Sequence, residues 1–550
     1  MSDNLKLAQL LFPNITETPD DMEAKFPPRN LKEGVRVTRL APSPTGFLHF
    51  GNLFAGTVAY RTAKTTDGIF FVRVEDTDQK RKIEGAVKVM LDGLEAFGVT
   101  ADEGVIGEDM EKGDYGPYYQ SKRKDIYHVF AKTLVEKDLA YPCFCSAEEL
   151  DEIRAQQENE PQKGYWGKYA KCRNLTLAEI EEKISAGAPW TLRLKSPGNA
   201  ENKCFIDDMI KGKIEMPENV QDIVLLKSDG IPTYHFAHAV DDHLMGTTHV
   251  IRGEEWLPSL PKHIQLFAAL GFKLPKYMHI AQIMKLDENG NKKKLSKRDM
   301  GANMDDYTRM GYAPECVCEY IMTLLNSNYE EWHMQNADKP YTEFPFNIKK
   351  MSVSGCLFDF GKLNDVSKNI ISRMSAEEVT AKITAWALEF DAEFGEELAK
   401  DKAFSEKIFA IGRGGKKPRK DLATWADAKP YMGFFYDAFF KIEDNYPENF
   451  DKNDIVAALT SFAETYDEAD DMNTWFDKVK AIAEGLGYAS DMKAYKADPA
   501  AFKGNVADIS MFIRVAVTGK MNAPDLYTVM QIIGKEKTLA RINSMINNLK

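Results

Sequence analysis

The alternation of hydrophobic and polar positions predicts a mixed α/β domain near the start of this chain. Residues 35–40 (VRVTRL) and 69–74 (IFFVRV) are apolar runs of strand length, and residues 50–65 between them have the spacing of a helix. A strand, a helix and a strand within about 40 residues predict a parallel βαβ crossover. A second helix is predicted over residues 85–98, where apolar side chains recur at helical spacing. Its predicted core face is made by Val87, Met90, Leu91, Leu94 and Phe97.

The pattern changes between about residues 115 and 220, where short segments alternate with Pro, Gly and charged residues. This texture predicts an inserted α+β subdomain. Strands of the parallel sheet are expected to return at residues 222–227, 249–252 and 278–284. The sequence therefore predicts a domain that is interrupted by an insertion and then resumed.

Beyond about residue 310 the strand signal largely disappears, and segments such as 313–325, 376–390 and 452–550 have helical periodicity. The predicted fold class is α/β, with a parallel-sheet domain interrupted by an α+β insertion and followed by an all-α half. The predicted boundaries are a lead-in with a short helix over 1–34, sheet-domain halves over 35–114 and 222–310, an insertion over 115–221, and helical regions over 311–375 and 376–550.

Composition narrows the class of protein. The chain has 550 residues, of which 44% are hydrophobic and 28% charged, so a disordered chain, a fibrous repeat and a small disulfide-stapled scaffold are excluded. The net charge of −13 argues against a generic nucleic-acid coat but leaves room for a local basic track. The seven cysteines form no even framework, and no apolar stretch reaches the roughly 18 residues of a membrane span. With no secretory signal, a cytoplasmic protein in a reducing compartment is expected.

Two motifs carry candidate chemistry. The first, RLAPSPTGFLHFGN at residues 39–52, connects a predicted parallel strand to a helix. Such a junction presents backbone N–H groups and the positive end of a helix dipole to an anion, and His49 can donate a hydrogen bond to a phosphate there. The second, KKKLSKR at residues 292–298, has five cations in seven positions and can bring ammonium groups to a polyphosphate. Taken alone, His49 also fits a structural loop histidine, and residues 292–298 fit a solvated basic loop.

Together the two motifs resemble the paired signatures of class I aminoacyl-tRNA synthetases. Residues 49–52 (HFGN) match the "HIGH" element, with Asn52 in place of its last histidine, and residues 294–298 (KLSKR) match the "KMSKS" element. Four further segments are similar to the catalytic domain of glutamate–tRNA ligases: APSPTG (41–46), VRVEDTD (72–78), LLKSDGIPTYHFAHAVDDHLMG (225–246) and HVIRGEEW (249–256). The helical half resembles the bacterial form of that family, through GYAPE (311–315), FDFGKLN (358–364), RVAVTGK (514–520) and IGKEKTLARI (533–542).

The resemblance implies a Rossmann-like catalytic domain, an insertion that binds the tRNA acceptor stem, a helical stem-contact domain over 311–375 and an anticodon-binding region over 376–550. It implies ATP-dependent formation of glutamyl-adenylate and transfer of the glutamyl group to the 3′ end of tRNA(Glu). The implied partners are L-glutamate, ATP with Mg²⁺ and tRNA(Glu), and a monomer is expected. Because charge moves around a phosphorus, catalysis is mainly positioning and electrostatic stabilisation. The resemblance assigns that role to His49 and Lys297.

The resemblance also implies the residues that bind the small substrates. Around glutamate it places Arg39, Ser43, Glu75, Tyr234, His238 and Arg252. An arginine can hold the side-chain carboxylate bidentately, and Glu75 offers the opposite charge for the substrate ammonium. Taken alone, Glu75, Asp76 and Asp78 also fit a solvated strand end. Around ATP the resemblance places His49, Gly51, Glu255, Trp256, Leu286, Lys294 and Lys297.

A metal site in the insertion is one of two alternatives. Cys143 and Cys145 form a C-x-C pair, and Cys172 follows 27 positions later. Some members of the resembling family bind zinc in this region. Their histidine two positions past the third cysteine is Asn174 here, so Tyr165 or Tyr169 would supply the fourth ligand, although structural zinc prefers Cys and His. The alternative is a set of free buried thiols.

A basic cluster in the helical half is the candidate anticodon contact. Residues 413–420 (RGGKKPRK) carry five cations in eight positions, and the resemblance places Arg419 at the anticodon, with Arg514 as the next candidate. Phosphate contacts would supply affinity, and a few side chains would read bases. The structural alternative is a solvated loop.

Other functions remain as alternatives: a glutamine-specific or non-discriminating ligase, a short glutamyl-queuosine ligase, and an inactive RNA-binding relative. Arg252 and the helical tail argue against glutamine specificity, and the anticodon-binding half argues against the short ligase. The presence of His49 and Lys297 argues against an inactive relative. Whether tRNA(Gln) is also charged stays open.

Overall fold

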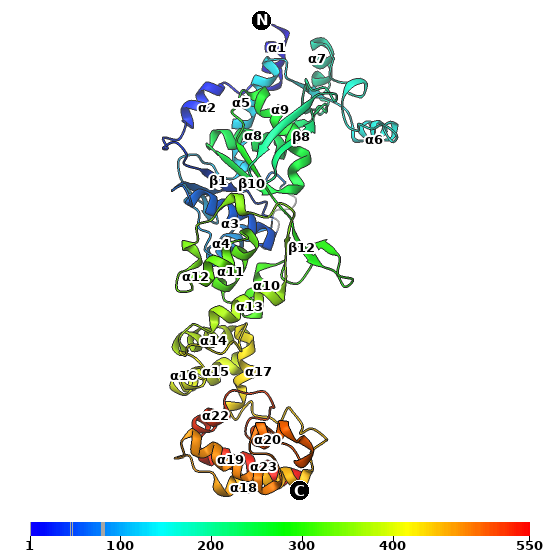
Figure 1. Ribbon diagram of the computed structural model, residues 1–550. Coiled ribbons are helices and arrows are strands. Elements are labelled where there is room, and N and C mark those ends of the chain that lie inside the picture. Colours follow the sequence, from blue (N-terminus) through cyan, green and yellow to red (C-terminus); the bar gives the residue numbers. More distant parts are fainter. Residues whose placement is uncertain (1, 45, 47, 79–82, 297) are drawn as a thin grey trace. The chain divides into compact units, whose positions relative to one another are not determined.

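The computed structural model describes residues 2–44, 46, 48–78, 83–296 and 298–550. The chain forms two compact units (Figure 1). The first unit comprises Met1–Asp306 and Val317–Asp359, and the second comprises Tyr307–Cys316 and Phe360–Lys550. Among the described residues, no helix is long and apolar enough to cross a membrane.

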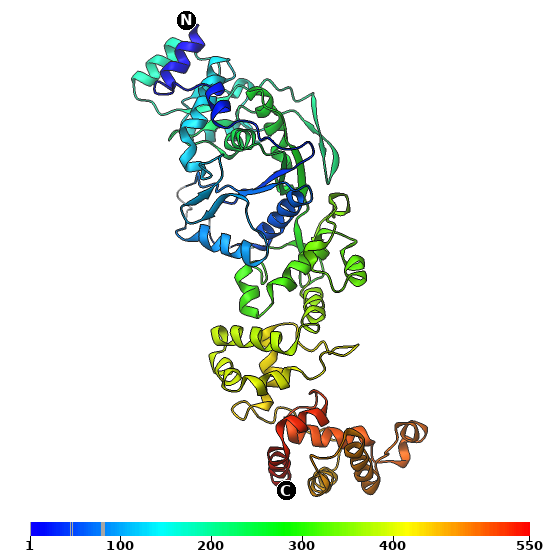
Figure 2. The same cartoon turned by 90° about the vertical axis from the view of Figure 1, so that its left-hand side faces the viewer.

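A parallel sheet forms the centre of the first unit. The strands β1 (Val37–Leu40), β2 (Ile69–Val72) and β3 (Glu103–Gly107) run parallel in that order, and the short β4 (Met110–Lys112) pairs antiparallel with β3. Helix α3 (Phe50–Lys64) connects β1 to β2 and packs across both strands (Figure 2). The predicted βαβ crossover is confirmed.

The second half of the parallel sheet lies on the other side of β1. Strand β10 (His249–Gly253) pairs parallel with β11 (Lys276–Ile280). The residue before β10, Thr248, donates its backbone N–H to the carbonyl oxygen of Val37 at 3.0 Å, so β10 lies beside β1. The chain thus runs outward from β1 in one direction and from β10 in the other. In such sheets, ligands bind at the carboxyl ends of the two strands where the order reverses.

The strand over residues 222–227 is a correction to the sequence analysis. β9 (Val224–Leu226) does not return to the parallel sheet but pairs antiparallel with β6 (Thr191–Leu194), which also pairs with β5 (Ala140–Cys143). A short apolar run looks alike in a parallel and an antiparallel sheet, so periodicity could not separate them. The insertion also contains the antiparallel hairpin of β7 (Lys203–Asp208) and β8 (Gly212–Pro217).

The predicted strand over residues 278–284 is divided. β11 ends at Ile280, and β12 (Ile283–Leu286) starts a separate small sheet with β13 (Lys292–Lys294) and β14 (Cys356–Leu357). β14 lies within the region 311–375 that the sequence predicts as helical.

Helix α4 (Ala86–Ala96) confirms the predicted amphipathic helix, because Val87, Met90, Leu94 and Phe97 are buried and Leu91 is partly buried. The lead-in forms two helices rather than one, α1 (Asp3–Leu11) and α2 (Pro19–Lys25), which pack on α5 (Lys124–Glu136). The remaining helices of the first unit are α6 (Ala147–Gln156), α7 (Leu177–Ser185), α8 (Tyr234–Leu244), α9 (Leu260–Leu270) and α12 (Tyr329–Gln335), with short 3₁₀ turns η2 (Gln120–Arg123), η3 (Gly167–Tyr169), η4 (Glu254–Ser259), η5 (Tyr341–Glu343) and η6 (Ile348–Lys350).

The second unit is built from helices around its own apolar core, whose fully buried members include Ile383, Phe394, Leu459 and Phe512. The predicted helices over 313–325 and 376–390 are confirmed as α11 (Pro314–Leu325), which belongs to the first unit from Val317 onward, and α14 (Ala376–Phe390) of the second unit. The other helices from residue 304 onward are α10 (Met304–Met310), α13 (Phe360–Ile371), α15 (Ala392–Lys400), α16 (Lys402–Phe409), α17 (Ala428–Met432), α18 (Lys452–Thr465), α19 (Met472–Leu486), α20 (Met492–Ala497), α21 (Val506–Thr518), α22 (Leu526–Ile533) and α23 (Lys535–Leu549), with 3₁₀ turns η7 (Trp425–Asp427), η8 (Gly433–Phe435) and η9 (Pro499–Ala501).

Candidate active site

Arg39 lies at the carboxyl end of β1, where the sheet order reverses, and only 3% of it is exposed. Its Nε donates to both carboxylate oxygens of Asp242, at 3.0 and 3.2 Å, and its Nη1 donates to the carbonyl oxygen of Ile251 in β10. Burial raises the pKa of Asp242, but the positive charges of Arg39 and Arg73 outweigh burial and hold that pKa well below its ordinary value. Asp242 is therefore an ionised anchor for Arg39.

Arg252, in β10, is held by two imidazole rings. Its Nε donates to Nε2 of His279, and its Nη1 donates to Nδ1 of His263, both over 3.0 Å. Its guanidinium carbon lies 4.7 Å from the centre of the Tyr277 ring. Among the residues that the structure describes, none accepts a hydrogen bond from the buried Nη2 of Arg252. Because a buried donor is costly to leave unpaired, this atom is a strong candidate to bind a ligand.

Aromatic side chains pack near Arg252. The ring of Tyr234, the first residue of α8, stacks on His238 and packs against Trp256, whose ring centre is 4.2 Å away. His238 is fully buried, with its Nδ1 2.6 Å from Asp242 and its Nε2 3.0 Å from the hydroxyl of Tyr277. Both ring nitrogens of His238 therefore contact protein atoms, and Tyr234 lies against its face. The structure brings together Arg39, Tyr234, His238, Arg252 and Trp256 of the predicted site.

Glu75 follows β2 and has a side chain that is only 9% exposed, so the solvated strand end considered for it is wrong. Arg73 donates to Oε1 of Glu75 at 3.3 Å. The backbone N–H of Glu75 donates to the carbonyl oxygen of Pro42. Burial raises the pKa of Glu75 to about 7, against the lowering effect of Arg73 and Arg39. The bond to Pro42 places Glu75 beside the loop that carries the exposed Ser43.

A buried ionic network beneath these residues was missed by the sequence analysis. Arg73 and Arg123 are fully buried; Arg73 donates to Asp242 at 2.7 Å, and Arg123 donates to Asp241 at 2.7 Å. A charge inside an apolar strand, as in IFFVRV, must find a partner, since burying it alone is very costly. The sequence signal that could have predicted these partners is the pair of adjacent acids, Asp241 and Asp242, in the otherwise apolar helix HFAHAVDDHL.

His49 caps the N-terminus of α3, where its Nδ1 accepts a hydrogen bond from the backbone N–H of Gly51 at 3.0 Å. In the neutral ring the proton is then on Nε2, which is the atom that can donate to a phosphate. The residues next to His49 form backbone hydrogen bonds with the segment that follows the second motif. Phe50 donates its N–H to Ala302, and Met304 donates its N–H to Leu48. The fold thus brings the first motif to the end of the basic loop.

The basic loop begins on a hairpin, since β13 carries Lys294 and pairs antiparallel with β12. Asp299 holds its far end by accepting from the backbone N–H of Ser296 at 2.7 Å and from Lys285 at 2.8 Å. Lys297, the predicted catalytic lysine, lies outside the described residues.

The remaining residues predicted to bind the nucleotide are accessible. Lys294 and Glu255 are exposed, and 51% of Leu286 is exposed. A Cβ atom on Gly253 would lie 2.1 Å from Oε2 of Glu255, so glycine lets this carboxylate lie against the end of β10. Glu255 follows the carboxyl end of β10, whereas Leu286 and Lys294 lie on the hairpin of β12 and β13.

Three thiols meet in the insertion. The Sγ atoms of Cys143, Cys145 and Cys172 lie within 4.8 Å of one another, and those of Cys145 and Cys172 are 3.7 Å apart. The hydroxyl of Tyr165 is 3.3 Å from the Sγ of Cys145, whereas the hydroxyl of Tyr169 donates to Glu160. Hydrogen bonding from Cys172 lowers the pKa of Cys143 to about 4. Tyr165 is thus better placed than Tyr169 to complete a metal site.

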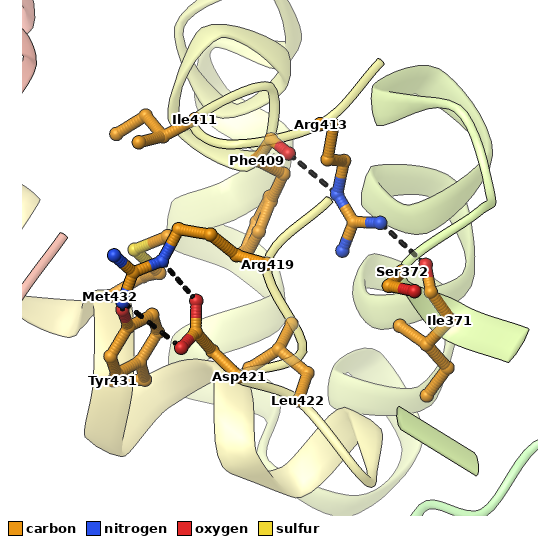
Figure 3. A pocket seen from close by; sticks show the side chains of 10 residues that line it. All are labelled: Ile371, Ser372, Phe409, Ile411, Arg413, Arg419, Asp421, Leu422, Tyr431 and Met432. Atoms are coloured by element: carbon orange, nitrogen blue, oxygen red, sulfur yellow. Dashed lines mark hydrogen bonds and ion pairs between the residues drawn. The ribbon is translucent and has the colours of Figure 1, made fainter. Parts of the chain in front are cut away.

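In the second unit, Arg419 lies in a shallow pocket with Asp421 and Tyr431 (Figure 3). It donates to both carboxylate oxygens of Asp421 and to the hydroxyl of Tyr431, while 41% of its side chain stays exposed. Arg413 points to the other side, where it donates to the carbonyl oxygens of Phe409 and Ile371 (Figure 3). Arg514, in α21, donates to the carbonyl oxygens of Ala523 and Pro524.

Comparison with protein families gives two matches. The family of class I tRNA synthetases for glutamate and glutamine, represented by its catalytic domain, matches residues 35–365. An anticodon-binding domain matches residues 419–546.

Individual relatives agree with these matches. The chain is 49% identical over 547 residues to a glutamate–tRNA ligase of Acetivibrio thermocellus, covering 99% of this chain and all of the relative. It is 47% identical over 549 residues to a glutamate–tRNA ligase of Clostridium beijerinckii, covering 98% of this chain and 99% of the relative. Among solved structures, a glutamate–tRNA ligase from Elizabethkingia meningosepticum in complex with its amino acid superposes with a TM-score of 0.74 at 29% identity, covering 94% of this chain and all of that structure.

Proposed function

This chain belongs to the class I tRNA synthetases for glutamate and glutamine, and from that premise we propose how its residues divide the work of the reaction. Its activity is that of a glutamate–tRNA ligase. The reaction joins L-glutamate to the 3′ end of tRNA(Glu) through a glutamyl-adenylate, with release of pyrophosphate and then AMP.

The buried Nη2 of Arg252, which has no acceptor among the described residues, is the observation that carries our assignment of the amino-acid pocket. We assign the substrate side-chain carboxylate to this atom, because a carboxylate satisfies a buried guanidinium donor and an amide NH₂ would face it with another donor. Glu75 receives the substrate ammonium, with Ser43 beside it and Tyr234 as the wall of the pocket. Arg39 is assigned to the same pocket, where Asp242 fixes its position at the end of β1.

The nucleotide is assigned to the segment between the two motifs. His49 Nε2, the N–H groups at the start of α3 around Gly51, and Lys294 and Lys297 of the basic loop supply donors for phosphate oxygens. Glu255, Trp256 and Leu286 are assigned to the adenosine. ATP binds with Mg²⁺, which neutralises charge on the phosphates, and the chain's own part is to position the substrate carboxylate near the α-phosphorus.

tRNA(Glu) is assigned to both units. The insertion over residues 115–221 would bind the acceptor stem, the region 311–375 would contact the stem, and Arg419 and Arg514 would contact the anticodon. This assignment is supported by the anticodon-binding match over 419–546. A single-chain enzyme located in the cytoplasm is the state that we propose.

Zinc is proposed as a structural ion of the insertion. With Zn–S bonds of about 2.3 Å, tetrahedral thiolates lie about 3.8 Å apart, and the Cys145–Cys172 separation of 3.7 Å fits that geometry. The three Sγ atoms all lie within 4.8 Å of one another, which is close enough for them to share one ion. Cys143, Cys145 and Cys172 would supply three ligands, with Tyr165 beside the fourth position.

If zinc binds, purified protein should contain about one zinc ion per chain, and Cys172→Ser should lose it. Cys204→Ser should keep the ion, because the thiol of Cys204 lies outside the cluster. Metal analysis and thermal unfolding with and without a chelator measure this. If the purified protein contains no metal and its unfolding temperature does not change in the chelator, the three cysteines are free thiols.

Pyrophosphate exchange tests the function and its amino-acid specificity together. We expect exchange with glutamate and not with glutamine when total tRNA is present. Arg252→Ala should reduce kcat/KM for glutamate by about 30- to 5,000-fold, with little change in KM for ATP. A glutamine-specific enzyme would show the opposite amino-acid preference. Charging of purified tRNA(Glu) and tRNA(Gln) separates a discriminating from a non-discriminating ligase.

A further inference from the structure

The guanidinium of Arg252 is oriented by hydrogen-bond acceptors that carry no negative charge. Its Nε and Nη1 each donate to an imidazole nitrogen at 3.0 Å, and no carboxylate pairs with it among the described residues. Arg39 differs, because it is held by the carboxylate of Asp242. A carboxylate beside Arg252 would neutralise it and compete with an anionic substrate, whereas a neutral imidazole fixes its direction and leaves its charge available.

The geometry fixes which tautomer His279 must have. Its Nδ1 lies 2.7 Å from Oδ2 of the fully buried side chain of Asp208, so Nδ1 carries the proton and donates it to the carboxylate. Its Nε2 is then the lone pair that accepts from Arg252. Burial lowers the pKa of His279, against the raising effect of Asp208, and keeps the ring neutral. The same orienting arrangement of carboxylate and imidazole sets ligand direction at metal sites.

The tautomer of His263, in α9, is also fixed by its hydrogen bonds. Its Nδ1 accepts from Arg252, so its proton is on Nε2, which donates to Nδ1 of His235 at 2.9 Å. Burial lowers the pKa of His263 well below its ordinary value, and that of His235 to about 4. Both acceptors of Arg252 are therefore neutral rings with defined tautomers.

Asp208 belongs to the insertion, not to the sheet that carries Arg252. It ends β7, and its Oδ1 accepts from the backbone N–H groups of Ile210 and Lys211 at the hairpin turn. The next residue, Met209, donates its N–H to the carbonyl oxygen of Tyr277 in β11. The turn of the β7–β8 hairpin and the ring of His279 are thus fixed by one carboxylate.

We propose that Asp208, His279 and His263 are positioning residues that aim the unpaired Nη2 of Arg252 at the side-chain carboxylate of the substrate. This inference rests on the proposed role of Arg252 and adds to it a relay from the insertion hairpin to the amino-acid pocket. None of the three positioning residues touches the substrate in this proposal. They act through the direction and the uncompensated charge of Arg252.

Substitution of His279 tests whether its Nε2, as a hydrogen-bond acceptor, positions Arg252. His279→Phe keeps a ring but leaves Nε of Arg252 without an acceptor, and should raise KM for glutamate about 10- to 100-fold while KM for ATP stays within about twofold. His279→Gln places an amide oxygen near the position of Nε2 and should restore most of the loss. Discrimination between glutamate and glutamine should fall in His279→Phe, since a misdirected guanidinium no longer rejects the amide.

Substitution of Asp208 tests the relay without changing a side chain that touches Arg252. In Asp208→Asn, one amide oxygen must serve four donors, namely the N–H groups of Ile210, Lys211 and His279 and the Nδ1 of His279. We expect KM for glutamate to rise about tenfold. Asp207→Asn makes the same charge change at the exposed neighbouring position and should leave both KM values unchanged.

Steady-state pyrophosphate exchange with full-length protein, together with thermal unfolding, separates the outcomes. The positioning role is overturned if His279→Phe raises KM for glutamate and ATP equally, if His279→Gln gives no rescue, or if Asp208→Asn behaves as Asp207→Asn. Arg252→Ala is the reference. If it leaves KM for glutamate unchanged, the proposed role of Arg252 fails; if it raises that KM while His279→Phe does not, only the positioning role fails.

Discussion

At the residue scale, five groups of the active site have pKa values displaced by burial. Burial lowers the pKa of His235 and His238 to about 4 and lowers those of His263 and His279, so these rings are neutral near pH 7. Burial also raises the pKa of Glu75 to about 7. Of these groups, only Glu75 would change its charge between pH 6 and pH 8.

Glu75 therefore predicts a pH dependence of glutamate use. A neutral carboxyl cannot pair with the substrate ammonium, so kcat/KM for glutamate should fall by about tenfold per unit as pH decreases below 7 and level off above it. The profile is measured by pyrophosphate exchange. Glu75→Gln should be less active and should lose this acid limb; if the limb persists unchanged in the variant, another group titrates.

At the element scale, the described residues on both sides of Lys297 are anchored. β12 and β13 form the base, Leu295 is buried, and Asp299 closes the far end by binding Ser296 and Lys285. The hydrogen bond from Lys285 lowers the pKa of Asp299 to about 2, so this closure is ionic across the working pH range. The bond between Phe50 and Ala302 then connects the loop to His49.

Removal of the predicted catalytic lysine should affect turnover rather than binding. Lys297→Ala is expected to lower kcat about 10²- to 10³-fold with little change in KM for glutamate, because one donor to the transition state is lost. Lys292→Ala removes an equal charge from the exposed base of the same loop and should keep near-normal kcat. A Lys297→Ala enzyme with kcat close to that of the wild type would remove Lys297 from the mechanism.

At the scale of the whole molecule, the two units have separate apolar cores. The first unit has one cluster at the parallel sheet and another that joins the insertion strands to α5, α8 and α9, whereas the second unit has a helical core. Substitutions at exposed positions of the second unit should therefore leave the geometry of the active site intact. In that unit, Asp421 holds the guanidinium of Arg419 in one plane, and 41% of the Arg419 side chain is exposed. A guanidinium plane fixed in this way suits stacking on an unpaired anticodon base.

Arg419→Ala should relax discrimination at one anticodon base by about 1–3 kcal/mol. Lys416→Ala, in the same basic cluster, is the matched control and should weaken all tRNAs equally, with a salt dependence reduced by about one counterion. Charging of tRNA(Glu) variants with altered anticodon bases measures both. A uniform loss in Arg419→Ala would make Arg419 an electrostatic contact only, and no loss would make residues 413–420 a solvated loop.

The class of fold, the family and most of the residues that meet in the pocket could be predicted from the sequence alone. The parallel crossover, the core face of α4 and the helical second half followed from periodicity, because apolar spacing records which face of an element is buried. Arg39 and Arg252 were named by the family resemblance, and the structure brings them together because β1 and β10 lie side by side.

Only the tertiary structure decided how those residues are held. The partners of Arg252 come from β11 and α9, that of Arg39 comes from α8, and the carboxylate that orients His279 comes from the insertion. The pairing of β9 with β6 was likewise invisible in a three-residue apolar run. The physical reason is the same in each case. Periodicity reports burial within one element, whereas the hydrogen-bond partners and the pKa of a buried polar group depend on atoms brought close from distant parts of the chain.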